Sequence, residues 1–156
     1  MTQTVVYQNG YLDNNLDYSK LFLFGNLFRT NTFYNATGGT LTYLPGTLLG
    51  RILSAGATQG YLVPCVSSAT DGSQIPASVL ETTITVAATS TYQITPCVSG
   101  EVDSALLVFN TGDTLATVCT AANSGADTVP IGTFEDVLVG KGIFPRTVSD
   151  NTKYDN

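Results

Sequence analysis

The sequence predicts a single, mainly β domain with the character of a small barrel or sandwich, and one short helix near its end. Three observations support this class. The length of 156 residues fits one domain. Charged residues make up only 12% of the chain, against about 25% in an average protein, and 24 threonines take their place. Short apolar segments follow one another with turn residues between them.

Six segments carry the strand pattern, because they are rich in Val, Ile, Leu, Thr and Tyr and are bounded by turn residues. These segments are residues 40–44, 48–54, 60–66, 79–87, 91–98 and 105–109. The turns expected between them are Pro45-Gly46, Ala55-Gly56, Asp71-Gly72-Ser73, Ser99-Gly100 and Thr111-Gly112-Asp113.

Within these segments, alternation and proline give finer predictions. Ile84 and Val86 alternate with threonines, which places both on the core face of a half-buried strand. Pro64 and Pro96 precede Cys65 and Cys97 in two similar segments, and proline cannot donate a hydrogen bond to a sheet. Both segments are therefore expected to be edge strands or to contain bulges.

One helix is expected near residue 134. Thr133 can cap its start, while Glu135 and Asp136 lie in the first turn, where the helix dipole favours acidic side chains. Phe134 and Leu138 are four positions apart and would pack on the sheet, and the glycines at 140 and 142 can end the helix. Residues 143–148 then have the pattern of a last strand.

The first 39 residues differ from the rest of the chain. They hold about half of its aromatic side chains and end at the pair Gly38-Gly39, which indicates a hinge or turn. We therefore divide the chain into an N-terminal arm, residues 1–39, and a β-rich domain, residues 40–156. So much aromatic surface suggests burial against a partner or against the domain itself.

Charge and composition exclude several functions. The formal net charge is −6 and the six basic residues are scattered, which argues against binding nucleic acid. The chain has no histidine, which excludes Ser-His-Asp and Cys-His catalysis. We expect no enzyme activity, no cofactor and no metal site. The longest apolar run is far too short to cross a membrane, so no membrane partner is expected.

Cys65, Cys97 and Cys119 are separated by 32 and 22 positions and contain no C-x-x-C motif. Such spacing matches neither a disulfide framework nor a metal knuckle. The start of the chain lacks the positive region of a secretory signal. We therefore expect a protein made in a reducing cytoplasm, with three unpaired and mostly buried thiols.

For several polar residues we favour a structural role over a functional site. Glu101 and Asp103 would share a strand face as a hydrolase pair does, yet no third group supports them, so surface charges are favoured. Asp71 and Asp113 read as turn residues, with calcium binding as the alternative. Asn35 begins an N-x-T glycosylation pattern that is expected to be idle without a secretory signal.

An ordered set of motifs resembles the phage lambda head decoration protein family. The set consists of LPGTLLGRI at residues 44–52, YLVP at 61–64, SATDGSQIPASVL at 68–80 and SGEV at 99–102. The resemblance covers about residues 40–148, and a helix followed by a strand is similar to the way many members end. Two features depart from the family: the long aromatic N-terminal segment, and an apparent insertion at residues 116–130.

The resemblance implies a small β-tulip or barrel-like domain that binds the outer surface of expanded phage heads and stabilises them, commonly as a trimer. Its implied partner is the major capsid protein, and its implied location is the virion. The strand-like segment at residues 4–7 could add to an exposed capsid sheet edge while the aromatic stretch fills an apolar groove. The capsid-binding candidates of this arm are Val5, Val6, Tyr7, Leu21, Phe22, Phe24 and Phe28. The family-motif turn is Thr70, Asp71 and Gly72.

Other protein classes share part of this profile. A phage tail, fibre or adhesin-type binding module would also be rich in threonine and β-structure, but should show longer repeats or a coiled-coil stalk. A carbohydrate-binding module would normally present tryptophan or clustered tyrosines, and the chain has no tryptophan. The tail, fibre or adhesin module is the alternative we retain.

Overall fold

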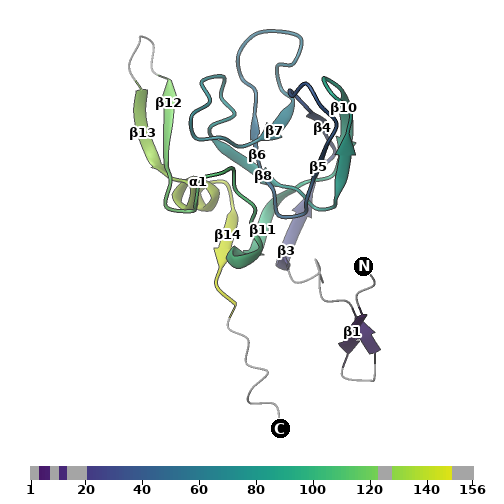
Figure 1. Cartoon of the computed structure of the whole chain (residues 1–156). Coiled ribbons are helices and arrows are strands. Elements are labelled where there is room, and N and C mark those ends of the chain that lie inside the picture. The colour runs from purple at the N-terminus through teal and green to yellow at the C-terminus, as the bar shows by residue number, and fades with distance from the viewer. Residues whose placement is uncertain (1–3, 8–10, 14–20, 123–127, 149–156) are drawn as a thin grey trace.

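A computed structural model describes residues 4–7, 11–13, 21–122 and 128–148. An eight-stranded sheet curls into a half-barrel, which confirms the mainly β, barrel-like class (Figure 1). The strands follow the order β10-β4-β7-β6-β8-β11-β14, and β3 also pairs with β11. The members of this sheet are β3 (Phe22–Phe28), β4 (Asn31–Tyr34), β6 (Leu48–Arg51), β7 (Leu62–Pro64), β8 (Pro76–Val79), β10 (Thr91–Ile94), β11 (Cys97–Asp103) and β14 (Ile143–Arg146).

In the part of the chain that the structure describes, three two-stranded sheets accompany the half-barrel. One pairs β5 (Leu41–Tyr43) with β9 (Ile84–Val86), and another is the hairpin of β12 (Val118–Ala122) and β13 (Thr128–Thr133). The third pairs β1 (Thr4–Tyr7) with β2 (Tyr11–Asp13). The segment at residues 4–7 is thus already paired within its own chain.

Among the described residues, two apolar clusters form the core. The first gathers side chains under β6, β8, β11, β14 and the helix, and includes Leu21, Val102 and Phe134, all fully buried. The second lies between β4, β6, β7, β9 and β10 and includes Phe33 and Leu62. Ile84 and Val86 are buried in this second cluster, as their alternation predicted.

The predicted helix is present as α1 (Phe134–Gly140). The Thr133 side chain accepts a hydrogen bond from the Asp136 amide, and the Asp136 side chain accepts one from the Thr133 amide. This reciprocal capping box satisfies two backbone donors that a helix start otherwise leaves free. Phe134 and Leu138 are fully buried, so the helix is held on the sheet by the face that the sequence indicated.

Three local predictions were wrong. Residues 105–109 form no strand; a short 3-10 helix, η2 (Ser104–Leu106), begins where the Asp103 carboxylate accepts the Ala105 amide. Gly100 and Ser99 form no turn but lie within β11, and Gly100 keeps a positive φ of 121° there. The expected strand at residues 79–87 is interrupted, because β8 ends at Val79 and β9 begins at Ile84.

The proline prediction held for only one segment. β10 is an edge strand, and Pro96 separates it from β11. β7, however, has β6 on one side and β4 on the other. Pro64 is tolerated there because it is the last residue of β7, whereas β4 reaches β7 only at Leu62.

The structure differs from the expected division at residue 39. β4 lies inside the main sheet between β10 and β7, and its Phe33 is fully buried. β3 pairs with β11, and Leu21 before it is also fully buried. Residues 21–39 therefore belong to the β-rich domain, because their apolar side chains fill its core. Gly38-Gly39 lies in the connection between β4 and β5.

Candidate functional site

The two most exposed apolar side chains of the sheet, Phe24 and Leu27, lie on β3. Phe24 is 77% exposed, Leu27 62% and Phe28 41%, and we call these three residues the β3 patch. Among the described strands β3 pairs only with β11, so the patch lies along an open edge of the half-barrel. An exposed apolar edge strand favours aggregation of an isolated protein, and it typically marks a surface that a partner covers.

The register of the sheet explains why Phe24 points outward. Glu101 of β11 lies opposite Phe24 of β3 on one side and Phe144 of β14 on the other. Residues directly opposite one another share a face, so Phe24 and Phe144 flank Glu101 on the outer face. The next residue, Val102, is fully buried and belongs to the first core cluster.

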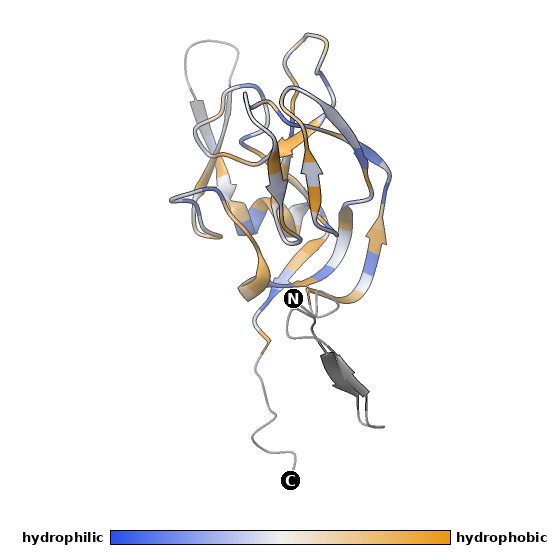
Figure 2. Cartoon of the chain, turned by 45° about the vertical axis from the view of Figure 1, so that its right-hand side comes forward, coloured by the Kyte–Doolittle hydropathy of each residue, from blue (hydrophilic) through white to orange (hydrophobic). Residues whose placement is uncertain are grey.

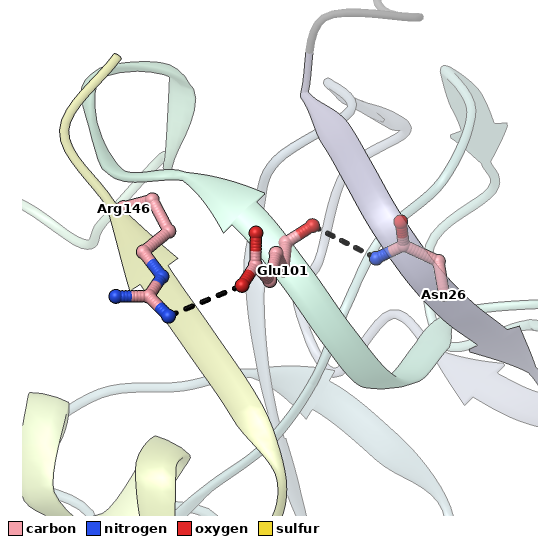
Figure 3. Close-up of polar contacts among 3 residues, drawn as sticks. All are labelled: Asn26, Glu101 and Arg146. Carbon is pink, nitrogen blue, oxygen red and sulfur yellow. Dashed lines mark hydrogen bonds and ion pairs between the residues drawn. The ribbon is translucent and has the colours of Figure 1, made fainter.

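Polar contacts join the three strands that carry this face (Figure 3). Asn26 Nδ2 of β3 donates to the Glu101 carbonyl oxygen at 2.9 Å. The Glu101 carboxylate in turn pairs with Arg146 Nη2 of β14 at 3.1 Å. These contacts link the three neighbouring strands β3, β11 and β14.

β3 and β14 also bring the two ends of the domain together. Phe22, the first residue of β3, lies opposite Val102, and Arg146, the last residue of β14, lies opposite Asp103. The chain therefore enters and leaves the half-barrel at the same end of β11 (Figure 1). Figure 2 shows apolar and polar residues interleaved along these strands.

A second apolar surface is a groove of about 560 Å³ on another part of the domain. Leu41, Leu44 and Val108 are exposed at this groove. Its deeper lining consists of Leu48, Ile52, Val63, Cys65 and Phe109. Asp71 also lines the groove, and its Oδ1 is occupied by the Ser73 amide at 3.0 Å and hydroxyl at 2.6 Å.

The other polar candidates have structural partners. Asp71 is a turn residue, as predicted. Asp113 instead contacts a distant part of the chain, because its two carboxylate oxygens accept hydrogen bonds from the Ser67 amide at 3.1 Å and the Ser67 hydroxyl at 2.6 Å. In the described part of the chain, no three His, Cys, Asp or Glu side chains are grouped as metal ligands would be. Glu101 and Asp103 are separately engaged, by Arg146 and by the Ala105 amide.

Asn35, the first residue of the glycosylation pattern, is fully buried. Its amide nitrogen donates to the carbonyls of Gly39, Val86 and Ala87, and its oxygen accepts from Thr37 and Tyr43. This side chain ties the end of β4 to the β5–β9 sheet, so it is a structural residue.

Comparison with protein families gives a match that covers most of the domain. The model for bacteriophage lambda head decoration protein D matches residues 26–130, which is more than half of the chain. The chain belongs to this family. Searches of curated proteins and of solved structures gave no match. The head decoration family is one of structural phage proteins, so the chain is associated with the phage capsid.

The matched region of the head decoration family differs from the span expected from the motifs. It begins at residue 26, inside β3, and so includes β4 as well as the motifs from residue 44 onward. It ends at residue 130, before α1 and β14. Residues 116–130, which looked like an insertion, fall within it and supply most of the β12–β13 hairpin.

The structure separates the seven residues predicted to bind the capsid. Leu21 is fully buried and Phe22 packs against the first core cluster, so both belong to the interior of this decoration-family domain. Phe24 and Phe28 are exposed, although the Phe28 ring meets Phe22 edge-on at 5.1 Å. Val5, Val6 and Tyr7 lie in β1.

Sequence reasoning missed two exposed residues of this surface. Leu27 lies in the same aromatic stretch, where β3 shows no regular alternation of buried and exposed positions; Gly25 has a φ of 65° within the strand, and the register with β11 shifts along it. Phe144 comes from the far end of the chain and joins the surface only through β11. No local signal in the sequence connects it to Phe24.

The family-motif turn is at the groove. Gly72 has a φ of 102°, which L-residues rarely adopt, and the Asp71 carbonyl accepts the amides of Leu53 and Ser54. Thr70 is exposed beside it. The turn shapes the groove wall, because Asp71 and Ser73 both line it.

In the described residues no helix is long and apolar enough to cross a membrane.

Proposed function

We propose that the protein binds the outer surface of the expanded phage head and stabilises it as a cement protein. Its direct partner is the major capsid protein. The observation that carries this proposal is the β3 patch, an exposed apolar edge in a chain that belongs to a head decoration family. A decoration protein needs an apolar surface that is exposed before it meets the shell, and it needs no catalytic group.

The end of the domain at which β3 begins and β14 ends faces the shell in this proposal. Residues 1–20 join the domain there, so the N-terminal segment and the β3 patch reach the same capsid region. Val5, Val6 and Tyr7 supply β-structure that can extend a capsid sheet, while Phe24, Leu27 and Phe28 supply apolar contact. Leu21 and Phe22 act by holding β3 on the core.

The protein acts as a homotrimer in this proposal, either before binding or on the shell. A trimer that contacts the repetitive lattice at three equivalent places gains affinity from multivalency, so that each contact can be modest. Family membership favours this head role over a tail, fibre or adhesin-type module, because the matched family is a head protein family.

Binding to expanded shells tests the proposal directly. Shells of the matching phage that lack this protein are mixed with the purified full chain, and bound protein is measured by co-sedimentation. Calorimetry of the shells then measures their disruption temperature, which should rise on decoration. Phe24→Asp should weaken binding about 10- to 100-fold, because burying one large apolar side chain contributes about 1.5–3 kcal/mol.

Tyr92→Asp is the matched control. Tyr92 is an aromatic residue on β10, at the opposite edge of the sheet, and it is 49% exposed. Its substitution should leave shell binding unchanged, and both variants should keep the wild-type melting temperature. A wild-type chain that neither binds expanded shells nor raises their disruption temperature would overturn the proposed function.

A further inference from the structure

An ion pair lies between two exposed aromatic side chains on the outer face of the sheet. Glu101 of β11 lies opposite Phe24 of β3 on one side and Phe144 of β14 on the other. Phe24 is 77% exposed and Phe144 40%. The Glu101 carboxylate pairs with Arg146, which follows Phe144 by two positions on β14 and so shares its face (Figure 3). Three neighbouring strands thus place apolar, charged and apolar side chains next to one another.

The spacing of the strands means that a partner cannot cover both rings without covering Glu101. Neighbouring strands lie about 4.8 Å apart, so the backbones at Phe24 and Phe144 are separated by about 10 Å, with Glu101 between them. In the free chain the Arg146 side chain is 59% exposed and the Glu101 side chain 35%. Water therefore solvates both charges until a partner covers this face, and such an exposed pair adds little to folding stability.

The ion pair can form further hydrogen bonds with a partner. Arg146 Nη2 donates to Glu101 Oε1 at 3.1 Å. Among the described residues, the second carboxylate oxygen and the other guanidinium nitrogens have no hydrogen-bond partner. A covered charge pair is favourable only when these remaining groups are also satisfied. The face is therefore complementary to a surface that places apolar side chains over the two rings and polar groups over the ion pair.

We propose that the Glu101–Arg146 ion pair lies inside the contact with the phage shell and determines which capsid surface can bind. This inference rests on the proposed shell binding, and it extends that contact from the β3 patch across β11 to β14. The partner is the capsid because the chain belongs to a head decoration family and this face is continuous with the β3 patch. β14 lies outside the matched residues 26–130, so the match assigns it no role. A purely apolar surface would leave the covered charges without water and without further partners, so it should bind poorly.

Two single substitutions and their combination, measured by co-sedimentation of the full chain with expanded shells, test the inference. Glu101→Gln and Arg146→Gln each remove one charge, and the Asn26 contact is kept because it uses the Glu101 backbone carbonyl. Each single variant should weaken binding by at least about 10-fold, because it leaves one covered charge without its partner. The double variant should bind at least as tightly as either single variant, since it leaves no charge to cover. Smaller losses in the single variants, or a double variant that binds more weakly than both, would overturn the inference.

Glu135→Gln and Lys141→Gln are the matched controls, because each changes the net charge by the same amount as one test substitution. Both side chains are exposed, on α1 and at its C-terminal end. α1 packs in the first core cluster with Ile143, on the face of β14 opposite to Phe144, so both controls should bind shells as wild type does. Urea unfolding of the two test variants should stay close to wild type, as an exposed pair predicts. A loss of folding stability that matches the loss of binding would show a structural role and overturn the inference.

Phe144→Ser tests how far the contact extends. It should weaken shell binding about 10-fold, because a large apolar side chain is lost from the covered face. Tyr92→Ser, at the opposite edge of the sheet, should bind as wild type does. If wild type binds shells and Phe144→Ser binds equally well, the contact ends at β3 and this inference alone is wrong. If the charge variants hinder self-association in light scattering and leave shell binding unchanged, the face joins copies of the chain and the inference is also wrong. A wild-type chain that does not bind expanded shells would instead overturn the proposed function.

Discussion

The Gly100 backbone lies directly against the Asn26 side chain. A Cβ atom at Gly100 would lie 2.6 Å from both Asn26 Cα and Asn26 Nδ2, a distance that real Cβ atoms do not show. Gly100 also has a φ of 121° and donates its amide hydrogen to the Gly142 carbonyl at 2.9 Å. The absence of a side chain at Gly100 lets β3 approach β11, and Asn26 then reaches the Glu101 carbonyl (Figure 3).

Gly100→Ala should therefore destabilise the domain by at least about 2 kcal/mol, from backbone strain and from separation of β3 and β11. Urea unfolding measures the change. Gly38→Ala is the control, because a Cβ there meets nothing within 4 Å and should change stability by less than about 1 kcal/mol. Equal effects of the two substitutions would contradict the packing described for β3.

Asn35→Ala should destabilise the protein by about 2–4 kcal/mol, because it leaves buried backbone carbonyls and the Tyr43 hydroxyl without their partner. Thermal or urea unfolding measures the loss. Asn110→Ala, in an exposed loop, should change stability by less than about 0.5 kcal/mol. If both variants unfold alike, Asn35 does not have the structural role assigned to it.

Two deletions distinguish an arm from a structural segment. Removal of residues 1–39 takes away β3 and β4 with the buried Leu21 and Phe33, so we expect no cooperative melt. Removal of residues 1–20 should leave a cooperative melt close to wild type and should weaken shell binding. Calorimetry and co-sedimentation measure the two properties. A cooperative melt after deletion of residues 1–39 would show that β3 and β4 are dispensable.

The capping box gives a pH dependence. The amide and hydroxyl of Thr133 donate to the Asp136 carboxylate and lower its pKa below the ordinary value of 3.8. A lowered pKa in the folded state means that this stabilisation is present above pH 3.8 and is lost as the pH falls through the folded value. Wild type should be more stable than Asp136→Asn at pH 6, and the difference should shrink below pH 3.8. A difference that does not change across this range would contradict the assignment.

The three cysteines should titrate as buried thiols. All three are buried and unpaired, as the sequence predicted, and burial raises the pKa of each thiol. For Cys65 the charges of Cys119 and Asp113 raise the pKa further. A thiol reagent at pH 8 should react slowly with the native protein and count three thiols in denaturant. Rapid native reaction would place at least one thiol at the surface.

The sequence by itself determined the features that rest on local physics. The capped start of α1 follows from Thr133 and Asp136, which lie three positions apart and can satisfy each other's backbone donors. The burial of Ile84 and Val86 follows from their alternation with threonines in one strand. The β class follows from composition, and the family from ordered motifs within residues 44–102.

Only the tertiary structure decided which aromatic side chains of β3 are available to a partner. Leu21 and Phe24 lie in one apolar stretch, yet one is fully buried and the other is 77% exposed. The difference arises from β11, whose irregular register and glycine at position 100 set which face each β3 residue takes. Phe144 joins the same surface from 120 positions beyond Phe24, through its pairing with Glu101. The pairing of strands that are distant in sequence depends on how the whole sheet packs, so a local sequence pattern does not predict it.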